Sequence, residues 1–236
     1  MCVLVLRIAL CLLLPFAAIF VLGAMPGVNL AWDFSNTSGF IAGVLFLVLF
    51  AYTGRPLKQP RNDGKFFMVL HRDLGFVALI MLLVHIGVML IDEPLVVDQL
   101  LPGAPWPMVA GNVATLCLLL LVPLSLTAAR RRLWKTHQRF KHWHYAMSAG
   151  IVLLTAVHMI GIGYYSGSNI KVVFWLVLTA IALALPLIKS GKTQVGPGGR
   201  QRHTSYLATC LSLGVLLTGL LLAGGYSLLG SVDLPQ

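Results

Sequence analysis

The chain has 236 residues, of which 58% are hydrophobic and only 10% are charged, and its mean hydropathy is +0.88. These values lie outside the range of water-soluble globular domains and predict a protein embedded in a membrane. A net charge of +10 would suit nucleic-acid binding, but the cations gather in alternate connections between apolar segments, which favours a membrane topology instead.

Seven apolar stretches are long enough, or nearly so, to cross a bilayer as helices. They cover approximately residues 3–22, 38–53, 66–91, 108–128, 143–164, 172–188 and 206–229. The connections show no strand-like alternation and no glycine-rich phosphate loop. The sequence therefore predicts an all-α, polytopic transmembrane bundle of six to seven helices. The number depends on the first stretch, where Arg7 and the small residues Gly23 and Ala24 also resemble a cleavable secretory signal, although its length favours a retained helix.

Basic residues fill every second connection. They are Arg55, Lys58, Arg61 and Lys65, then Arg130, Arg131, Arg132, Lys135, Arg139 and Lys141, then Lys189, Lys192, Arg200 and Arg202. The other connections carry Asp33, then Asp92, Glu93 and Asp98. This positive-inside pattern predicts a cytoplasmic N-terminus and an external C-terminus, as expected of a protein in a bacterial inner (plasma) membrane. The stretches 66–91 and 143–164 then run in the same direction.

Four histidines form two matched pairs, His71 with His85 and His144 with His158, each fourteen residues apart. Fourteen residues of α-helix fall about 40° short of four turns and rise ~21 Å, so both members of a pair lie on one helix face at different depths. On two parallel helices, His71 would lie level with His144 and His85 with His158. The spacing predicts two facing histidine pairs, the arrangement that two stacked bis-histidine haems need.

Three interpretations of these histidines compete. Isolated histidines can simply bond neighbouring helices, but two equally spaced pairs on parallel helices seldom arise independently. Zinc prefers four ligands, and each level offers only two imidazoles. A haem already supplies four nitrogens to iron and needs two axial ligands. We therefore expect His71, His85, His144 and His158 to be axial ligands of haem iron, with a haem-free transporter or membrane scaffold that uses them for proton relay or helix packing as the alternative.

Other polar and small residues fit this hypothesis less specifically. Gly75, Ser148, Ala149 and Gly150 lie beside the ligands and would let a flat ring approach, although small residues also serve ordinary helix packing. Arg72, Arg139 and Lys141 could pair with haem propionates or reflect topology alone. We expect the remaining histidines, His137, His142 and His203, to be solvated surface residues. The four cysteines are scattered and are expected to act as small apolar residues.

Several motifs together resemble the ferric reductase-like transmembrane domain. These are His-Arg-Asp-Leu-Gly at 71–75 followed by His85, Phe-Lys-His-Trp-His-Tyr at 140–145 followed by His158, and a helix that starts at Ser38-Gly39 and ends Thr-Gly-Arg-Pro at 53–56. The family includes the haem cores of NADPH oxidases and ferric reductases and the haem subunit of the methionine sulfoxide reductase system. The resemblance covers roughly residues 36–190 and implies two b-type haems, the inner on His71 and His144 and the outer on His85 and His158.

The resemblance divides the chain into three parts. We expect residues 1–35 to form an N-terminal transmembrane helix, which could act as a signal anchor, and an outer loop. Residues 36–190 are expected to form the haem-binding core. Residues 191–236 are expected to form a basic cytoplasmic loop, a final transmembrane helix and a short outer tail. Oxidases and ferric reductases of the family add a flavin and nicotinamide domain, which we do not expect in these 236 residues because they lack a dinucleotide fingerprint. The methionine sulfoxide reductase subunit typically has arginine at the place of His71. The implied function is electron transfer from a separate flavoprotein, a quinol or a small soluble carrier to an external acceptor, such as an external redox enzyme.

Overall fold

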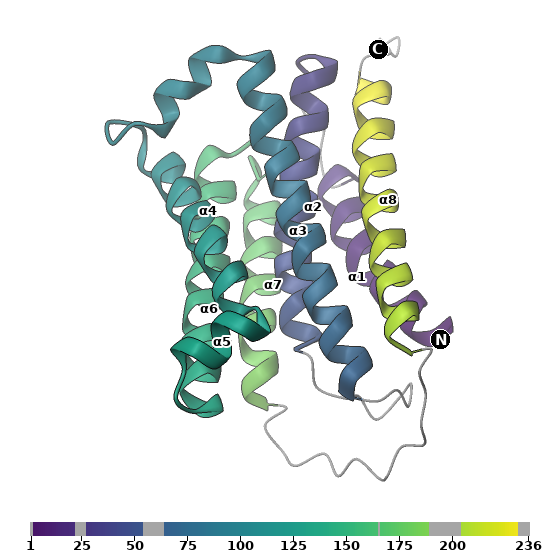
Figure 1. Cartoon of the computed structure of the whole chain (residues 1–236). Helices are drawn as coiled ribbons and strands as arrows, with labels where there is room; N and C mark the ends of the chain where they lie inside the picture. The colour runs from purple at the N-terminus through teal and green to yellow at the C-terminus, as the bar shows by residue number, and fades with distance from the viewer. Residues whose placement is uncertain (1, 22–26, 54–63, 165, 189–203, 231–236) are drawn as a thin grey trace. The chain divides into compact units, whose positions relative to one another are not determined.

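The computed structural model describes residues 2–21, 27–53, 64–164, 166–188 and 204–230, and these contain only helices (Figure 1). The α-helices are α1 (Cys2–Val21), α2 (Leu30–Ala51), α3 (Gly64–Asp92), α4 (Trp106–Ser125), α5 (Thr127–Leu133), α6 (His137–Ile162), α7 (Asn169–Ile188) and α8 (Thr204–Gly230), with a 3₁₀-helix η1 at Pro94–Leu100. All except α5 and η1 are long and apolar enough to span a membrane, which gives seven candidate spans. The predicted all-α transmembrane architecture is confirmed.

The helices group into two compact units. Unit 1 comprises Met1–Pro94 and Ala180–Gln236, and therefore contains α1, α2, α3 and α8. Unit 2 comprises Leu95–Thr179 and contains α4, α5 and α6. The boundary between Thr179 and Ala180 falls inside α7.

In unit 1, α2 is the central helix and packs against α1, α3 and α8. Two thirds (67%) of its most apolar window is buried, compared with 28% for α1, α3 and α8. Large side chains such as Phe40 and Leu45 of α2 and Phe67 and Met81 of α3 are fully enclosed. Because lipid is as apolar as these side chains, close packing rather than transfer from water holds such helices together.

Helix α2 begins at Leu30, eight residues before the apolar stretch predicted at residue 38. Its first turns are polar yet buried, because their hydroxyl groups bond to the helix itself. Thr37 Oγ1 donates to the Asp33 carbonyl at 2.7 Å, and Ser38 Oγ donates to the Phe34 carbonyl at 2.8 Å. Back-bonding of this kind lets hydroxyl side chains enter an apolar environment, so hydropathy alone placed the start of the helix too late.

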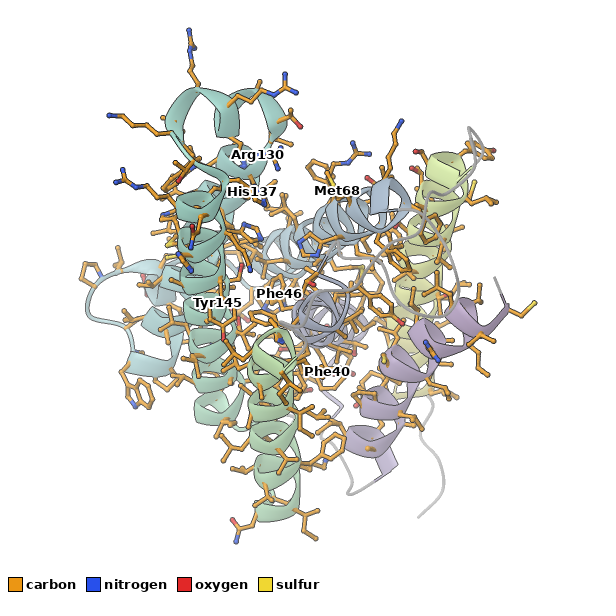
Figure 2. All side chains as sticks on the ribbon, turned by 90° about the horizontal axis from the view of Figure 1, so that it is seen from below. Phe40, Phe46, Met68, Arg130, His137 and Tyr145 are labelled. Carbon is orange, nitrogen blue, oxygen red and sulfur yellow. The ribbon has the colours of Figure 1, made fainter. Side chains whose placement is uncertain are left out.

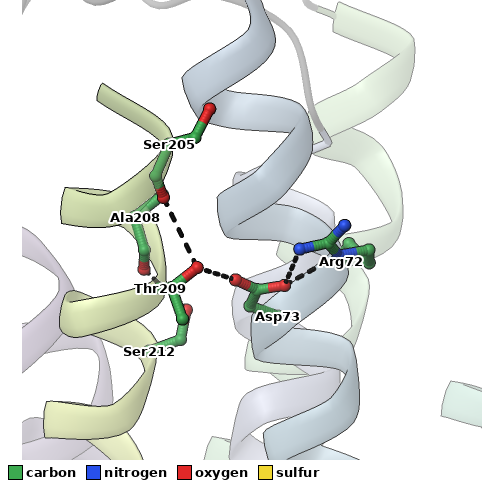
Figure 3. A network of polar contacts seen from close by, with 6 residues as sticks. All are labelled: Arg72, Asp73, Ser205, Ala208, Thr209 and Ser212. Carbon is green, nitrogen blue, oxygen red and sulfur yellow. Dashed lines mark hydrogen bonds and ion pairs between the residues drawn. The ribbon is translucent and has the colours of Figure 1, made fainter. Parts of the chain in front are cut away.

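Polar contacts join the helices of unit 1 at both ends. At one end, the Asn29 side-chain amide donates to Asp92 Oδ2 at 3.1 Å, and Ser227 Oγ donates to the Leu30 carbonyl at 2.6 Å. At the other, Thr209 of α8 donates to Asp73 Oδ2 of α3 at 2.6 Å (Figure 3). The second oxygen of that carboxylate pairs with Arg72 at 2.7 Å. The charge of Asp73 is thus neutralised by its neighbour in sequence while the carboxylate fixes α8 to α3.

In unit 2, α4 and α6 pack closely along their lengths. A Cβ added at Gly161 of α6 would come within 2.6 Å of the Pro107 side chain, so this crossing needs a glycine. Helix α6 ends at Gly163, which has the left-handed φ of 72° that favours glycine at a helix C-terminus. It begins at His137, six residues before the predicted stretch, because Thr136 accepts a hydrogen bond from the Arg139 amide at 3.3 Å as the N-cap.

Candidate functional site

Both histidines of α3 direct their Nδ1 atoms at the backbone of α2. His71 Nδ1 lies 2.6 Å from the carbonyl oxygen of Tyr52, the C-cap residue of α2. His85 Nδ1 lies 2.9 Å from the carbonyl oxygen of Ser35, whose hydroxyl in turn donates to the His85 carbonyl at 2.7 Å. A carbonyl oxygen only accepts, so each Nδ1 carries the proton and the neutral ring has its lone pair on Nε2.

The two predicted ligands of α6 are held in the same way by α4. His158 Nδ1 lies 3.0 Å from the carbonyl oxygen of Pro107, in the first turn of α4. His144 Nδ1 lies 3.0 Å from the hydroxyl oxygen of Ser125, the last residue of α4. A hydroxyl can donate as well as accept, so the Ser125 contact does not by itself fix which nitrogen of His144 carries the proton. The Ser35 hydroxyl also lies 3.2 Å from His85 Nδ1, beside the carbonyl contact of that ring.

Each unit therefore contains an antiparallel helix pair of the same design. The second helix carries two histidines fourteen residues apart, and the first helix supplies one partner near its start and one at its end. The partners are 17 positions apart in α2 (35 to 52) and 18 positions apart in α4 (107 to 125). The histidines are thus regularly spaced on one helix of each pair, and their hydrogen-bond partners are regularly spaced on the other.

Glycines make room for two of the four rings. A Cβ on Gly39 of α2 would lie 2.8 Å from Cγ of His85, and a Cβ on Gly111 of α4 would lie 2.7 Å from Nδ1 of His158. Each glycine stands four residues after the carbonyl that its histidine contacts, Ser35 or Pro107. In an α-helix the Cβ of residue i+4 leans back over the carbonyl of residue i, so a ring can reach that carbonyl only where the Cβ is missing.

His71 and His144 need no such glycine, because their partners lie at helix ends. Tyr52 is the C-cap of α2, and its carbonyl is not covered by a following helical turn. Ser125 ends α4 two residues after Pro123, and it offers a side-chain oxygen. The structure thus distinguishes two kinds of histidine position, one over a helix body and one at a helix end.

The remaining residues singled out from the sequence are placed as follows. A Cβ at Gly75 or Gly150 would meet nothing within 4 Å, so neither glycine is in close helix contact within its own unit. His137 and His142 are exposed, as predicted, and so are Arg139 and Lys141. His203, together with the cations at 55–61 and 189–202, lies outside the described residues.

The facing of the two histidine pairs stays a prediction, because His71 and His85 belong to unit 1 whereas His144 and His158 belong to unit 2. Within the described ranges, no three His, Cys, Asp or Glu side chains gather as a metal-binding group. Two imidazoles per level suit a haem, whose macrocycle supplies the other four nitrogens. The buried indole N–H of Trp134 finds no acceptor among the described residues, so a ligand carboxylate such as a haem propionate would satisfy it.

Sequence reasoning found the four histidines and missed the groups that orient them. Tyr52 and Pro107 act through their carbonyl oxygens, which every residue possesses, so their side chains give no signal. Ser35 contacts His85 through both its carbonyl and its hydroxyl, but it precedes the apolar stretch predicted to start at residue 38. Gly111 was detectable in principle, because it stands on the helix before the second histidine pair as Gly39 does before the first. Ser125 was hidden at the end of an apolar stretch predicted to run to residue 128.

Comparison with known families gives one match. The model of the ferric reductase like transmembrane component matches residues 38–155, which is half of the chain and lies inside the core expected at 36–190. The matched region contains His71, His85 and His144, and it stops three residues before His158. No curated protein and no solved structure matches the chain. The chain belongs to the ferric reductase-like transmembrane family, whose members are haem-containing membrane electron-transfer components.

Proposed function

We propose that this protein is a membrane b-type cytochrome that relays electrons through two haems, with His71 and His144 as axial ligands of the inner haem and His85 and His158 of the outer. The observation that carries the proposal is the hydrogen bond at each Nδ1 atom. Three of the four rings contact a carbonyl oxygen and the fourth contacts a hydroxyl. Histidines that ligate metals through Nε2 are typically held in this way by a partner of the other nitrogen.

The haem supplies the redox chemistry when bound, a one-electron couple between ferric and ferrous iron. The protein's own residues hold the imidazoles in fixed orientation, increase their basicity through the Nδ1 hydrogen bonds and exclude water. A haem bound between His71 and His144, or between His85 and His158, would have an imidazole on each side of its iron. The arrangement therefore favours electron relay over the binding of a substrate at iron.

Charge supports the direction of the relay. In unit 2, the basic segment 130–141 lies at the N-terminal end of α6, near His144. The acidic residue Asp98 lies before the N-terminal end of α4, where Pro107 contacts His158. By the positive-inside rule the His144 end of α6 faces the cytoplasm. Because the seven spans cross a bacterial plasma membrane in alternating directions, the N-terminus is then cytoplasmic and the C-terminus external. Electrons enter from a separate flavoprotein or a quinol and leave to an external acceptor, such as an external redox enzyme. The chain then acts as an electron-transfer subunit of an oxidoreductase.

The test is the haem content of the purified protein and of its histidine variants. We expect two b-type haems per chain and a split reduced band after dithionite addition. His85→Ala and His158→Ala should each remove mainly the outer haem. His71→Ala and His144→Ala should remove mainly the inner one, because loss of one of two axial ligands leaves the iron weakly held.

His142→Ala is the matched control, because His142 is exposed and lies only two residues from His144. This variant should keep both haems. A wild-type ratio near one haem per chain would overturn the two-haem assignment. A colourless extract would instead favour the haem-free alternative, in which the histidines serve proton relay or helix packing.

A further inference from the structure

An aromatic cluster lies at the basic end of unit 2, beside one of the proposed haem ligands. It consists of Trp134, His137, Phe140 and Trp143. Phe140 is its centre, with ring centroids 6.2 Å from Trp134, 6.3 Å from His137 and 6.4 Å from Trp143. Trp134 and Trp143 are themselves 4.9 Å apart. These separations are those of aromatic rings in direct contact.

Phe140 connects this cluster to His144. It stands one helical turn before His144 on α6, and the two ring centroids are 5.3 Å apart with 31° between the planes. The guanidinium carbon of Arg130 lies 5.5 Å from the centroid of the same ring, in cation–π contact. Phe140 itself is only 9% exposed. A continuous line of contacts therefore runs from Arg130, through one buried conjugated ring, to the imidazole of His144.

The surface around the cluster is positively charged. Its exposed cations are Arg131, Arg132, Lys135, Arg139 and Lys141. No Asp or Glu occurs anywhere between residues 99 and 232 of the sequence, so these cations have no acidic neighbour within their own segment. Figure 2 shows Arg130 and His137 at this end of unit 2, where nitrogen-tipped side chains project outward. Such a surface attracts an acidic protein and speeds its encounter.

We propose that this basic end is the docking surface for an acidic protein that carries a reduced flavin, and that its electrons enter the inner haem through Phe140 and His144. The inference rests on the proposed haem function; it selects the flavoprotein over the quinol as donor and adds the docking surface and the entry route. In each step the reduced flavin of the partner loses one electron and releases its proton to water. The inner haem iron gains the electron and passes from ferric to ferrous. No bond forms or breaks in the aromatic cluster.

A purely structural role for the cluster makes a different prediction. Tryptophan is enriched where membrane helices meet water, and the rings would then only anchor α6 at that boundary. An anchoring role predicts that changes in Phe140 alter stability or haem content. An entry role predicts a slower rate of haem reduction while haem content, spectrum and redox potential stay the same.

Stopped-flow reduction of the haem-loaded protein in nanodiscs separates these roles. The probes are reduced flavodoxin, an acidic flavin protein, and free reduced riboflavin, which has no protein surface. With flavodoxin, the wild-type rate should fall as salt is added, because screening weakens the attraction. Arg131→Glu together with Arg132→Glu should slow this reaction by roughly tenfold or more at low salt, the lower range of electrostatic steering effects. The same pair changed to lysine should keep the wild-type rate, and riboflavin should reduce all three proteins equally.

Phe140→Leu tests the route. It should slow reduction by both probes and keep the salt dependence with flavodoxin, and Phe140→Tyr should restore the rate. If Phe140→Leu loses haem, Trp143→Leu provides the second variant, with Trp143→Phe as its conservative partner. Charge reversal without effect on a haem-loaded protein would overturn the docking surface, and unchanged rates in the leucine variants would overturn the route. A wild-type protein without haem would instead defeat the proposed function itself.

Discussion

Replacing the glycines beside the outer ligands should remove the outer haem selectively. In Gly111→Ala the new Cβ would stand 2.7 Å from Nδ1 of His158, whereas ordinary contacts begin at about 3.4 Å. The ring must therefore retreat by about 0.7 Å (3.4 minus 2.7), which lengthens its 3.0 Å hydrogen bond to Pro107 to at most about 3.7 Å. In Gly39→Ala the corresponding retreat of His85 is about 0.6 Å (3.4 minus 2.8).

The expected loss follows from the role of that hydrogen bond. A bond longer than about 3.5 Å no longer orients the ring, and removing the partner of a metal-ligating histidine typically weakens metal binding by 10–100-fold, or about 1.4–2.8 kcal/mol. Gly111→Ala should lower outer haem retention by this factor, and Gly39→Ala by a smaller one, because the 2.9 Å bond of His85 would lengthen only to about 3.5 Å (2.9 plus 0.6). Both variants should leave the inner haem in place. Haem-to-protein ratio and a potentiometric titration of the two haem bands measure both effects.

Gly87→Ala is the matched control. Gly87 stands on α3 two residues after His85, and a Cβ there would meet nothing within 4 Å. This variant should retain full haem with unchanged potentials. The reasoning would be refuted if Gly39→Ala and Gly111→Ala also kept both haems at wild-type affinity, or if they lost the inner haem first.

Three further outcomes are expected. Ser125→Ala removes the hydroxyl that contacts His144 Nδ1 and should raise the potential of the inner haem in a redox titration, because an imidazole without its Nδ1 hydrogen bond donates less to iron. An equal shift of both haems would contradict this. Thr209→Val removes a bond to the Asp73 carboxylate and should cost about 1.5–3 kcal/mol, read as a lower unfolding midpoint in detergent. Thr218→Val on the same helix should cost less, because its exposed hydroxyl bonds only to Gly214. A reporter fused after Gln236 should be active only outside the cytoplasm, and activity inside would mean that the helix count is wrong.

Hydropathy was enough to predict six to seven spans, because it depends on side-chain type along continuous helices. The family was identified from the motifs around the paired histidines, whose side chains are specific enough to be recognised in the sequence. The start of α2 was predicted too late, since Asp33 and Thr37 look like loop residues until their bonds to the helix are known. The partners of the histidines escaped prediction for a related reason. Carbonyl oxygens such as that of Tyr52 are identical in every residue, and only the three-dimensional course of the chain selects one.

The matched helix pairs also bear on how the protein is made. The first pair, α2 and α3, contains His71 and His85 together with Tyr52 and Ser35, so all its orienting bonds can form once residue 92 has entered the membrane. The second pair completes its own set only when α6 is synthesised. Neither half waits for the other to prepare its imidazoles. On the proposed ligation, haem capture becomes a late event of biogenesis that needs both helix pairs, and a nascent chain stopped after α3 would carry prepared ligands but hold no haem.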